Sequence, residues 1–189
     1  MKKIILISSL LLFGASSVNS TQNWYAEGLR AETAGNIALA VKYYDKSANE
    51  QNLSDSMYAL GRLYRDAYSD SETSLEWFIK SAELGNPFAQ LELGLFYSNA
   101  NNIGVDKELA QYWLKKSFTN GAKKEAAWSL YDLSDTESEK LNWLKEAAVS
   151  GHQKAMYLLS DAYSSGLLGL DIDQDQSSYW LQSATRLEE

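Results

Sequence analysis

The amino-acid sequence predicts an all-α fold, an α/α solenoid built from about five helix hairpins in a row. A short segment that contains an aromatic residue recurs along the chain, as EWFIKSAELG, YWLKKSFTNG, NWLKEAAVSG and YWLQSATRLE. An apolar segment precedes each of them, and its apolar residues are spaced by three and four positions, the period of one helix face. No stretch shows the sustained alternation of apolar and polar residues that is typical of a strand.

The recurring segments define repeat units of about 34 residues. Alignment on one aromatic position gives spacings of 34, 36, 30 and 37 residues between Tyr43, Trp77, Trp113, Trp143 and Trp180. The preceding apolar segments align on Leu60, Leu93, Leu130 and Leu159. Each unit is therefore predicted to be a hairpin of two amphipathic helices. Because one hairpin cannot bury both of its faces, the hairpins must stack.

The units divide a single repeat domain, residues 21–189, in chain order. The first unit, about 22–53, is degenerate, and it is followed by units at 54–86, 87–121, 122–151 and 152–189. The fourth unit is the shortest, so its first helix is expected to end about a turn early. TESE at 136–139 then restarts the chain with a Thr-x-x-Glu capping box.

Residues at the helix ends support these boundaries. Gly85, Gly121 and Gly151 end second helices, where a left-handed residue is favoured. Seven residues before each aromatic position stands a residue of the N-cap type: Asn36, Asp70, Asp106, Thr136 and Asp173. Each second helix is therefore expected to begin at one of these caps.

Small residues follow the leucines of the first helices. Gly61 and Gly94 occupy this place in the second and third units, and Ser160 occupies it in the fifth. We expect the two helices of a hairpin to approach closely there. Tyr131 is the exception, in the fourth unit.

The N-terminus predicts export. Lys2 and Lys3 precede an apolar run from Ile4 to Phe13 and then small residues, so residues 1–20 are interpreted as a signal peptide cleaved after Ser20. The apolar run is too short for a membrane span, and none of the later runs reaches the roughly 20 residues that a span needs. The expected location is the periplasm of a Gram-negative bacterium, with secretion as the alternative.

The charge and the cysteine count exclude several classes of function. Without its leader the chain has 15 Lys and Arg against 25 Asp and Glu, a net charge of −10. Such a surface repels phosphate backbones, so nucleic acid is not an expected partner. There is no cysteine, which removes disulfides, thiolate metal sites and cysteine nucleophiles together.

The repeat resembles the Sel1-like repeat, a relative of the tetratricopeptide repeat. The third unit carries the pattern most fully, as Ala89, Leu93, Gly94, Tyr97, Gly104, Val105, Asp106, Ala110, Trp113, Lys116 and Gly121. The fourth unit lacks the Gly and the Tyr of its first helix, and the first unit looks as much like a tetratricopeptide unit. The resemblance implies a right-handed superhelix whose first helices line the inner surface.

No familiar catalytic constellation occurs in the sequence. Gly-x-Ser-x-Gly, Gly-x-Gly-x-x-Gly, a phosphate-binding loop and His-Glu-x-x-His are all missing. His152, the only histidine, is interpreted as a solvated residue at a helix start. Some Sel1-like proteins are connected with β-lactam binding or hydrolysis, but this chain has neither Ser-x-x-Lys nor the cysteine pairs of those proteins. No catalytic residue, cofactor or metal is predicted.

Three alternating aspartates, Asp171, Asp173 and Asp175, look like the start of an EF-hand loop. Such a loop needs Gly at its sixth position and Glu at its twelfth, where this chain has Gln176 and Gln182. The repeat alignment instead makes Asp173 the N-cap of the last helix and places Asp175 in its first turn, where the helix dipole favours an acid.

One row of side chains is predicted to lie on the concave face. Two residues before the leucines stand Tyr58, Leu91, Trp128 and Tyr157, with Tyr25 in the degenerate unit. Tyrosine and tryptophan give large contact area at low entropic cost, so the row suits a peptide or a partner helix. Packing between neighbouring units is the other interpretation of these aromatic residues.

Charged positions on the same face form a gradient. Arg62 and Arg65 lie in the second unit, Leu95 in the third, and Asp132 and Asp161 in the fourth and fifth. A partner is therefore expected to place an acidic end on the arginines and a basic end near the aspartates, a gradient that orients a ligand and speeds its association.

The sequence as a whole predicts an exported, non-catalytic protein-interaction module that binds a protein or peptide in its groove. Family precedent implies an adaptor, a signalling regulator or an immunity protein that blocks a toxin. The alternatives are a β-lactam-binding enzyme and a scaffold that binds envelope polysaccharide or peptidoglycan. A monomer is expected, with a dimer as the alternative. The predicted binding residues are Tyr58, Arg62, Arg65, Leu91, Leu95, Trp128, Asp132, Tyr157 and Asp161.

Overall fold

A computed structural model describes residues 23–99 and 105–186, and these ranges hold ten α-helices that pack in chain order as hairpins. The predicted leader and Gly104 lie outside the described residues. The helices are α1 (Trp24–Thr33), α2 (Ile37–Gln51), α3 (Ser54–Asp66), α4 (Ser71–Glu83), α5 (Pro87–Ser98), α6 (Lys107–Asn120), α7 (Lys123–Leu133), α8 (Glu137–Val149), α9 (Gln153–Ser165) and α10 (Gln174–Thr185). A short 3-10 helix, η1 (Leu167–Gly169), precedes α10.

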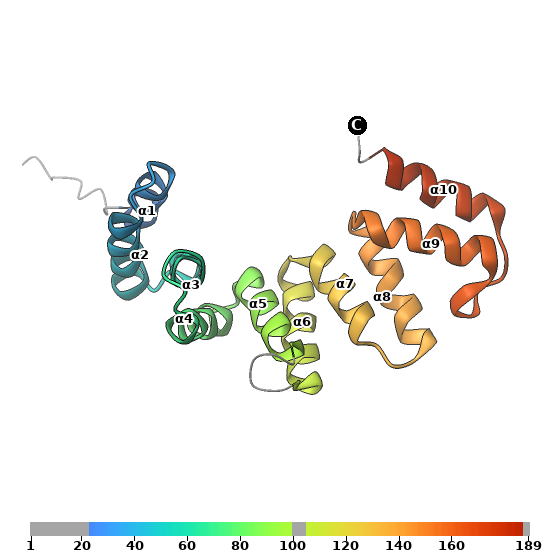
Figure 1. Ribbon diagram of the computed structural model, residues 1–189, viewed down its shortest axis with the longest axis horizontal. Coiled ribbons are helices and arrows are strands. Elements are labelled where there is room, and N and C mark those ends of the chain that lie inside the picture. Colours follow the sequence, from blue (N-terminus) through green and yellow to red (C-terminus); the bar gives the residue numbers. More distant parts are fainter. Residues whose placement is uncertain (1–22, 100–104, 187–189) are drawn as a thin grey trace, which may run out of the picture.

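The hairpins follow one another along an arc, with α1 and α10 at its two ends (Figure 1). In this view α3 lies above its partner α4, and α5 and α7 lie beside their partners α6 and α8. The all-α solenoid of five hairpins predicted from the sequence is thus confirmed. None of the helices in the described ranges is long and apolar enough to cross a membrane.

The first four hairpins each close around one large side chain on the second helix. The residue eight positions after the N-cap fills this place, as Tyr44, Phe78, Leu114 and Leu144, all at most 5% exposed. The aromatic residue one position earlier, used to align the repeats, is only half-buried. The buried core residue of the hairpin is therefore the one that follows the aromatic residue used for the alignment.

Glycine on the first helix makes room for that side chain. A Cβ atom added to Gly61 would lie 2.6 Å from the Phe78 ring, and one added to Gly94 would lie 2.5 Å from Leu114. Gly28 stands in the same relation to Tyr44 in the first unit. The close approach predicted at Gly61 and Gly94 is confirmed, and the degenerate first unit obeys the same rule.

All five predicted N-caps are confirmed. Each side chain accepts a hydrogen bond from a backbone N–H of its helix's first turn, at 2.9–3.2 Å, as seen for Asn36, Asp70, Asp106, Thr136 and Asp173. In three units the N–H of the cap also donates to the carbonyl of a first-helix tyrosine, from Asp70 to Tyr64, Asp106 to Tyr97 and Asp173 to Tyr163. The cap therefore fixes the hairpin turn as well as the helix start.

The fourth unit differs as predicted. Helix α7 ends at Leu133, three residues after its leucine, whereas α3 ends at Asp66, six residues after Leu60. Thr136 then caps α8, and the carboxylate of Glu139 accepts a hydrogen bond from the Thr136 hydroxyl at 3.1 Å. Tyr131, which replaces the glycine, stacks on Trp128 instead of making room for the second helix.

The units are joined by the predicted left-handed glycines. Gly85, Gly121 and Gly151 have φ angles of 89°, 130° and 90°, which a residue with a side chain rarely adopts. The next N–H in each case bonds to a carbonyl five residues back in the second helix, as from His152 to Ala147 at 2.9 Å. The same junction therefore recurs at three of the four boundaries between units, and Asn52, with a φ angle of 50°, ends the second helix at the other.

The outer face of α10 is more polar than the same face of the inner helices. Leu181 occupies the place of Phe78, Leu114 and Leu144 but is 47% exposed. Ser178 and Thr185, both exposed, stand where α8 has Leu141 and the buried Ala148. Such a composition is typical of a capping helix at the end of a solenoid.

One buried hydroxyl provides a test of the core. Ser56 is fully buried, and among the described residues its Oγ has no hydrogen-bond partner. The same place in the later units holds alanine, as Ala89, Ala126 and Ala155. An unpaired buried hydroxyl costs about 1–3 kcal/mol. We therefore expect Ser56→Ala to raise the free energy of unfolding by about 1 kcal/mol, measured by urea denaturation.

Ser81 is the matched control for Ser56. It is equally buried, but its Oγ donates to the Ser54 carbonyl at 2.7 Å. Ser81→Ala should therefore destabilise the protein by about 1 kcal/mol. Equal effects of the two alanine substitutions would contradict this account of the core.

The three aspartates are tested in the same way. Asp173→Ala should lower the free energy of unfolding by about 1 kcal/mol, because the N–H groups of Asp175 and Gln176 lose their acceptor. Asp171→Ala, a change at an exposed residue, should leave the stability unchanged. Calcium should not move the melting temperature in a thermal scan. A rise with calcium that requires Asp171 would restore the EF-hand interpretation.

Candidate functional site

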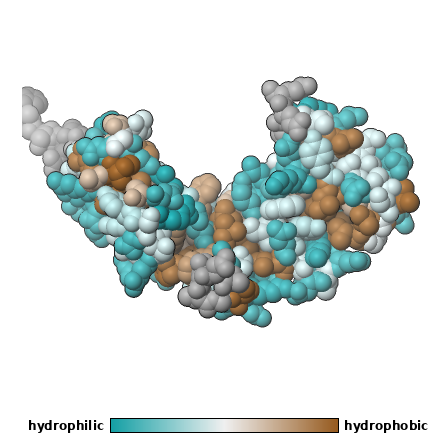
Figure 2. Space-filling model, viewed as in Figure 1, coloured by the Kyte–Doolittle hydropathy of each residue, from teal (hydrophilic) through white to brown (hydrophobic). Residues whose placement is uncertain are grey.

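The inner side of the arc is hollowed, and hydrophobic surface shows at the bottom of the hollow (Figure 2). The predicted binding residues fall into three separate cavities along it. Tyr58 and Arg62 line one of about 270 Å³, Arg65 and Leu95 line a second of about 290 Å³, and Trp128, Tyr157 and Asp161 line a third of about 420 Å³. Leu91 is half-buried and Asp132 is exposed.

The N-terminal cavity lies between α1, α3 and α5. Tyr25, Leu29, Asp55, Tyr58, Arg62 and Phe88 surround it, and the buried Tyr44 forms part of its wall. The Tyr44 hydroxyl donates to Glu32 at 2.8 Å, and Arg62 donates to the other oxygen of the same carboxylate. Burial and the hydrogen bond to Glu32 raise the pKa of Tyr44 above its usual range.

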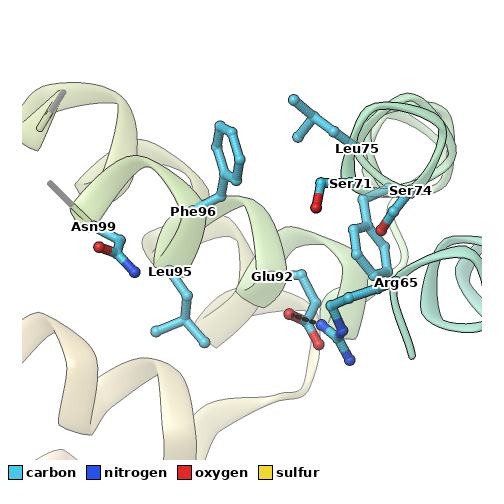
Figure 3. Close-up of a pocket in the computed structure, with 9 residues that line it drawn as sticks. Arg65, Ser71, Ser74, Leu75, Glu92, Leu95, Phe96 and Asn99 are labelled. Carbon is cyan, nitrogen blue, oxygen red and sulfur yellow. Dashed lines mark hydrogen bonds and ion pairs between the residues drawn. The ribbon is translucent and has the colours of Figure 1, made fainter. Parts of the chain in front are cut away.

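The second cavity lies where α3, α4 and α5 meet (Figure 3). The guanidinium of Arg65 donates to Glu92 at 2.6 Å and to its neighbour Asp66 at 2.8 Å. It also lies 5.5 Å from the centre of the Phe78 ring. Hydrogen bonds to Asp66 and Glu92 raise the pKa of Arg65, so this side chain is a charge already compensated by two carboxylates.

These ion pairs change the charge gradient expected from the sequence. Glu32 on α1 neutralises Arg62 on α3, and Glu92 on α5 together with Asp66 neutralises Arg65. The basic end of the gradient therefore carries no surplus positive charge. The acidic end remains, because Asp132 and Asp161 are exposed and join no ion pair among the described residues.

In the third cavity, Trp128 serves both packing and lining. Its ring stacks on His152 at 4.5 Å with an interplanar angle of 11°, and on Tyr131 at 5.3 Å with an angle of 25°. These contacts join α7 to the start of α9, so the side chain packs between the fourth and fifth units. It also lines the cavity beside Lys154 and Tyr157. The packing interpretation is therefore confirmed for Trp128, and its role in binding stays a prediction.

The prediction for His152 was only half right. The residue does start a helix, because its Nδ1 accepts a hydrogen bond from the N–H of Ala155 at 3.2 Å. It is half-buried, however, and its ring covers Trp128, so it is not a solvated residue. Its position directly after Gly151, the place of Asn86 in the third unit, was the sequence signal for a capping role.

Three residues of the hollow face escaped the sequence analysis. Phe88 is 52% exposed and lies 5.8 Å from Tyr58, and Asp55 lines the N-terminal cavity with it, whereas Glu32 accepts hydrogen bonds from two residues that line the cavity, Tyr44 and Arg62. All three lie outside the aligned rows, near the ends of their helices. A helical wheel centred on the tyrosines would include Asp55, but the pairing of Glu32 with Arg62 across 30 residues has no local signal.

Comparison with known proteins identifies the family. A model described as the Sel1 repeat matches residues 23–52, 54–86, 87–121 and 153–188, more than two thirds of the chain. The chain belongs to the Sel1 repeat family. The match includes the first unit, which the sequence alone left between Sel1-like and tetratricopeptide-like. Residues 122–152 fall outside it, in agreement with the missing Gly and Tyr of the fourth unit.

Two solved structures share the fold of this Sel1 repeat protein. A Sel1 repeat protein from Oxalobacter formigenes has 26% identity and a TM-score of 0.74 over 87% of this chain and 72% of that chain. A protective antigen of uropathogenic Escherichia coli strains, with an SLR fold, has 24% identity and a TM-score of 0.75 over 88% of this chain and 38% of that chain. This Sel1 repeat protein thus spans well under half of the antigen.

A third structure is more distant. It is an immunity protein from Pseudomonas aeruginosa with 19% identity and a TM-score of 0.47, over 87% of this chain and 80% of that chain. A likeness this low does not bear on the function of this protein. No curated protein sequence matches the chain. The comparisons therefore assign a family and a fold to this Sel1 repeat protein and leave its partner open.

The cap at His152 makes the stability of the fifth unit depend on pH. Burial lowers the pKa of His152 below its usual 6.5, the charges of Lys124 and Lys154 add to this shift, and those of Glu125 and Asp132 oppose it. A protonated Nδ1 cannot accept from Ala155. Since the folded state has the lower pKa, the unfolded chain takes up the proton first as the pH falls.

We therefore expect the His152 contribution to stability to be complete above pH 6.5 and to be lost as the pH falls toward the folded-state pKa. Urea denaturation between pH 7.5 and 5 measures it. His152→Asn keeps an N-cap acceptor that does not titrate, so its stability should fall less over the same range. The same slope in both proteins would show that other groups dominate the pH dependence.

Proposed function

We propose that this protein is an exported, non-catalytic interaction module whose concave face binds a basic segment of a partner protein. The first helices carry most of the side chains of that face on a row of packed hairpins. Some of these side chains line three cavities of about 270–420 Å³. Pockets that enclose a drug-sized ligand span about 300–1,000 Å³, and these cavities lie just below that range or near its lower end, so each suits one or a few side chains of a partner.

The internal neutralisation of Arg62 and Arg65 carries the proposal of a basic partner. Both guanidinium groups are held by carboxylates of neighbouring first helices, at 2.5 Å to Glu32 and 2.6 Å to Glu92. The exposed Asp132 and Asp161 farther along the face join no ion pair among the described residues. A partner with an acidic end on the arginines, as the sequence suggested, would have to displace these ion pairs.

The charge of the whole chain acts in the same direction. The formal net charge is −8, and it becomes −10 if the basic leader is removed. Such a field steers a cationic partner toward the protein and raises its association rate, and added salt weakens this effect. The basic side chains near the third cavity offset the field only locally, since Lys124 lies 3.2 Å from Glu125 and Lys154 remains beside Asp161.

A charge-reversal experiment tests the proposed function. The processed protein is used to capture proteins from a periplasmic extract, and the captured protein is then titrated against it at low and at physiological salt. The double variant Asp132→Lys, Asp161→Lys should slow association with the captured partner at least tenfold at low salt, because the charges that attract it are reversed.

The matched control reverses two exposed acids on second helices, Glu76→Lys and Glu146→Lys. This variant has the same net charge as the groove variant, so it should slow association only by the smaller effect of the overall field. Equal slowing by the two double variants would mean that the concave face does not bind the partner.

A further inference from the structure

The N-terminal cavity has four aromatic residues in its wall, whereas each of the other two cavities has two. Tyr25 and Tyr44 approach at 5.7 Å between ring centres, and Tyr58 and Phe88 approach at 5.8 Å. Leu29 and Phe88 are exposed at its rim, at 42% and 52%. Four aromatic rings from α1, α2, α3 and α5 thus border one hollow of about 270 Å³. Aromatic faces carry negative electrostatic potential and attract cations.

Of the two acidic groups at this place, Asp55 lines the cavity and Glu32 lies behind the lining residues Tyr44 and Arg62. Both oxygens of the Glu32 carboxylate already accept hydrogen bonds, one from Tyr44 and one from Arg62. Asp55 is exposed, and among the described residues only its Oδ1 accepts a hydrogen bond, from Asn86 at 2.8 Å. The Oδ2 atom of Asp55 is therefore the acceptor that a ligand in this cavity could reach.

The charges of the cavity sum to a negative value. Glu32 cancels Arg62, which leaves the charge of Asp55. The pKa of Tyr25 reflects this field, because burial raises it and the charges of Asp55 and Glu32 raise it further, against the smaller effect of Arg62. A cationic group fits this environment, whereas a carboxylate would meet the aromatic faces and the charge of Asp55.

From this arrangement, and resting on the proposed function, we propose that the cavity between α1, α3 and α5 receives one arginine or lysine side chain of the partner. The aliphatic stem of that side chain packs on Tyr58 and Phe88, and its cationic end lies beside Asp55. The cavity volume is just below the range of pockets that enclose a drug-sized ligand, which suits a single long side chain. The cavity is thus the anchor point of the basic segment.

Blocked amino acids test the pocket without any knowledge of the partner. Amide chemical shifts of the labelled, processed protein are followed by NMR during titration with N-acetyl-arginine methylamide and N-acetyl-lysine methylamide. Both should shift the signals of α1, α3 and the start of α5 and leave α8 and α10 unchanged. N-acetyl-norleucine methylamide, which has an apolar chain of similar length, should bind at least threefold more weakly than the cationic compounds.

Two substitutions locate the interactions. Asp55→Asn keeps the shape of the side chain and removes its charge, and we expect it to weaken arginine binding about two- to fivefold. Phe88→Ala removes an exposed aromatic ring and should weaken binding by a similar factor. Asp171→Asn, the same charge change at an exposed residue near α10, is the matched control and should leave binding unchanged. Thermal unfolding of each variant checks that the fold is intact.

Three results would overturn the pocket. These are norleucine binding as tight as that of arginine, shifts that map outside the cavity, and equal effects of Asp55→Asn and Asp171→Asn. If they occur while partner capture still depends on Asp132 and Asp161, the pocket is wrong and the proposed function stands. If the cationic compounds bind here but capture does not depend on the groove charges, the pocket stands and the proposed function is wrong.

Discussion

The contact between a large residue of the second helix and a glycine of the first helix, repeated in the first three units, determines the rest of this structure. Phe78 against Gly61 and Leu114 against Gly94 leave no space for a Cβ atom, which would lie within 2.6 Å of the opposing side chain. Such tight packing sets the distance between the two helices, because protein interiors resist overpacking. With that contact repeated in the first three units and a left-handed glycine at three of the four junctions between units, the hairpins follow an arc (Figure 1). The hollow face is a consequence of this arc.

Ion pairs between first helices then decide the chemistry of the hollow face. Arg62 reaches back to Glu32 on α1, and Arg65 reaches forward to Glu92 on α5, so each pair spans about one repeat. They join consecutive units and remove positive charge from the surface at the same time. What remains is an aromatic cavity with one available carboxylate at the N-terminal end and two exposed aspartates toward the C-terminal end. Both features favour a basic partner over an acidic one.

Local features were predicted well because the interactions behind them are local. An N-cap binds an N–H group two or three residues away, so Asp70 or Asp173 can be recognised from its spacing to the aromatic position. The early end of α7 follows from the shortened fourth unit in the same way. The small residues opposite the core were also recognisable, because Gly61 and Gly94 recur at one place in the repeat.

The sequence by itself determined the solenoid, its helix boundaries and one row of side chains on the first helices, but not Glu32, Asp55 and Phe88. Only the tertiary structure decided which of these side chains pair with another residue of the chain and are therefore not available to a partner. Arg62 forms an ion pair with Glu32, 30 residues away in the chain, and the ring of His152 stacks on Trp128 across a junction between units. Neither contact has a fixed spacing in the repeat, since it depends on how far one hairpin turns relative to the next. That angle is a property of the stacked units, so no single repeat encodes it.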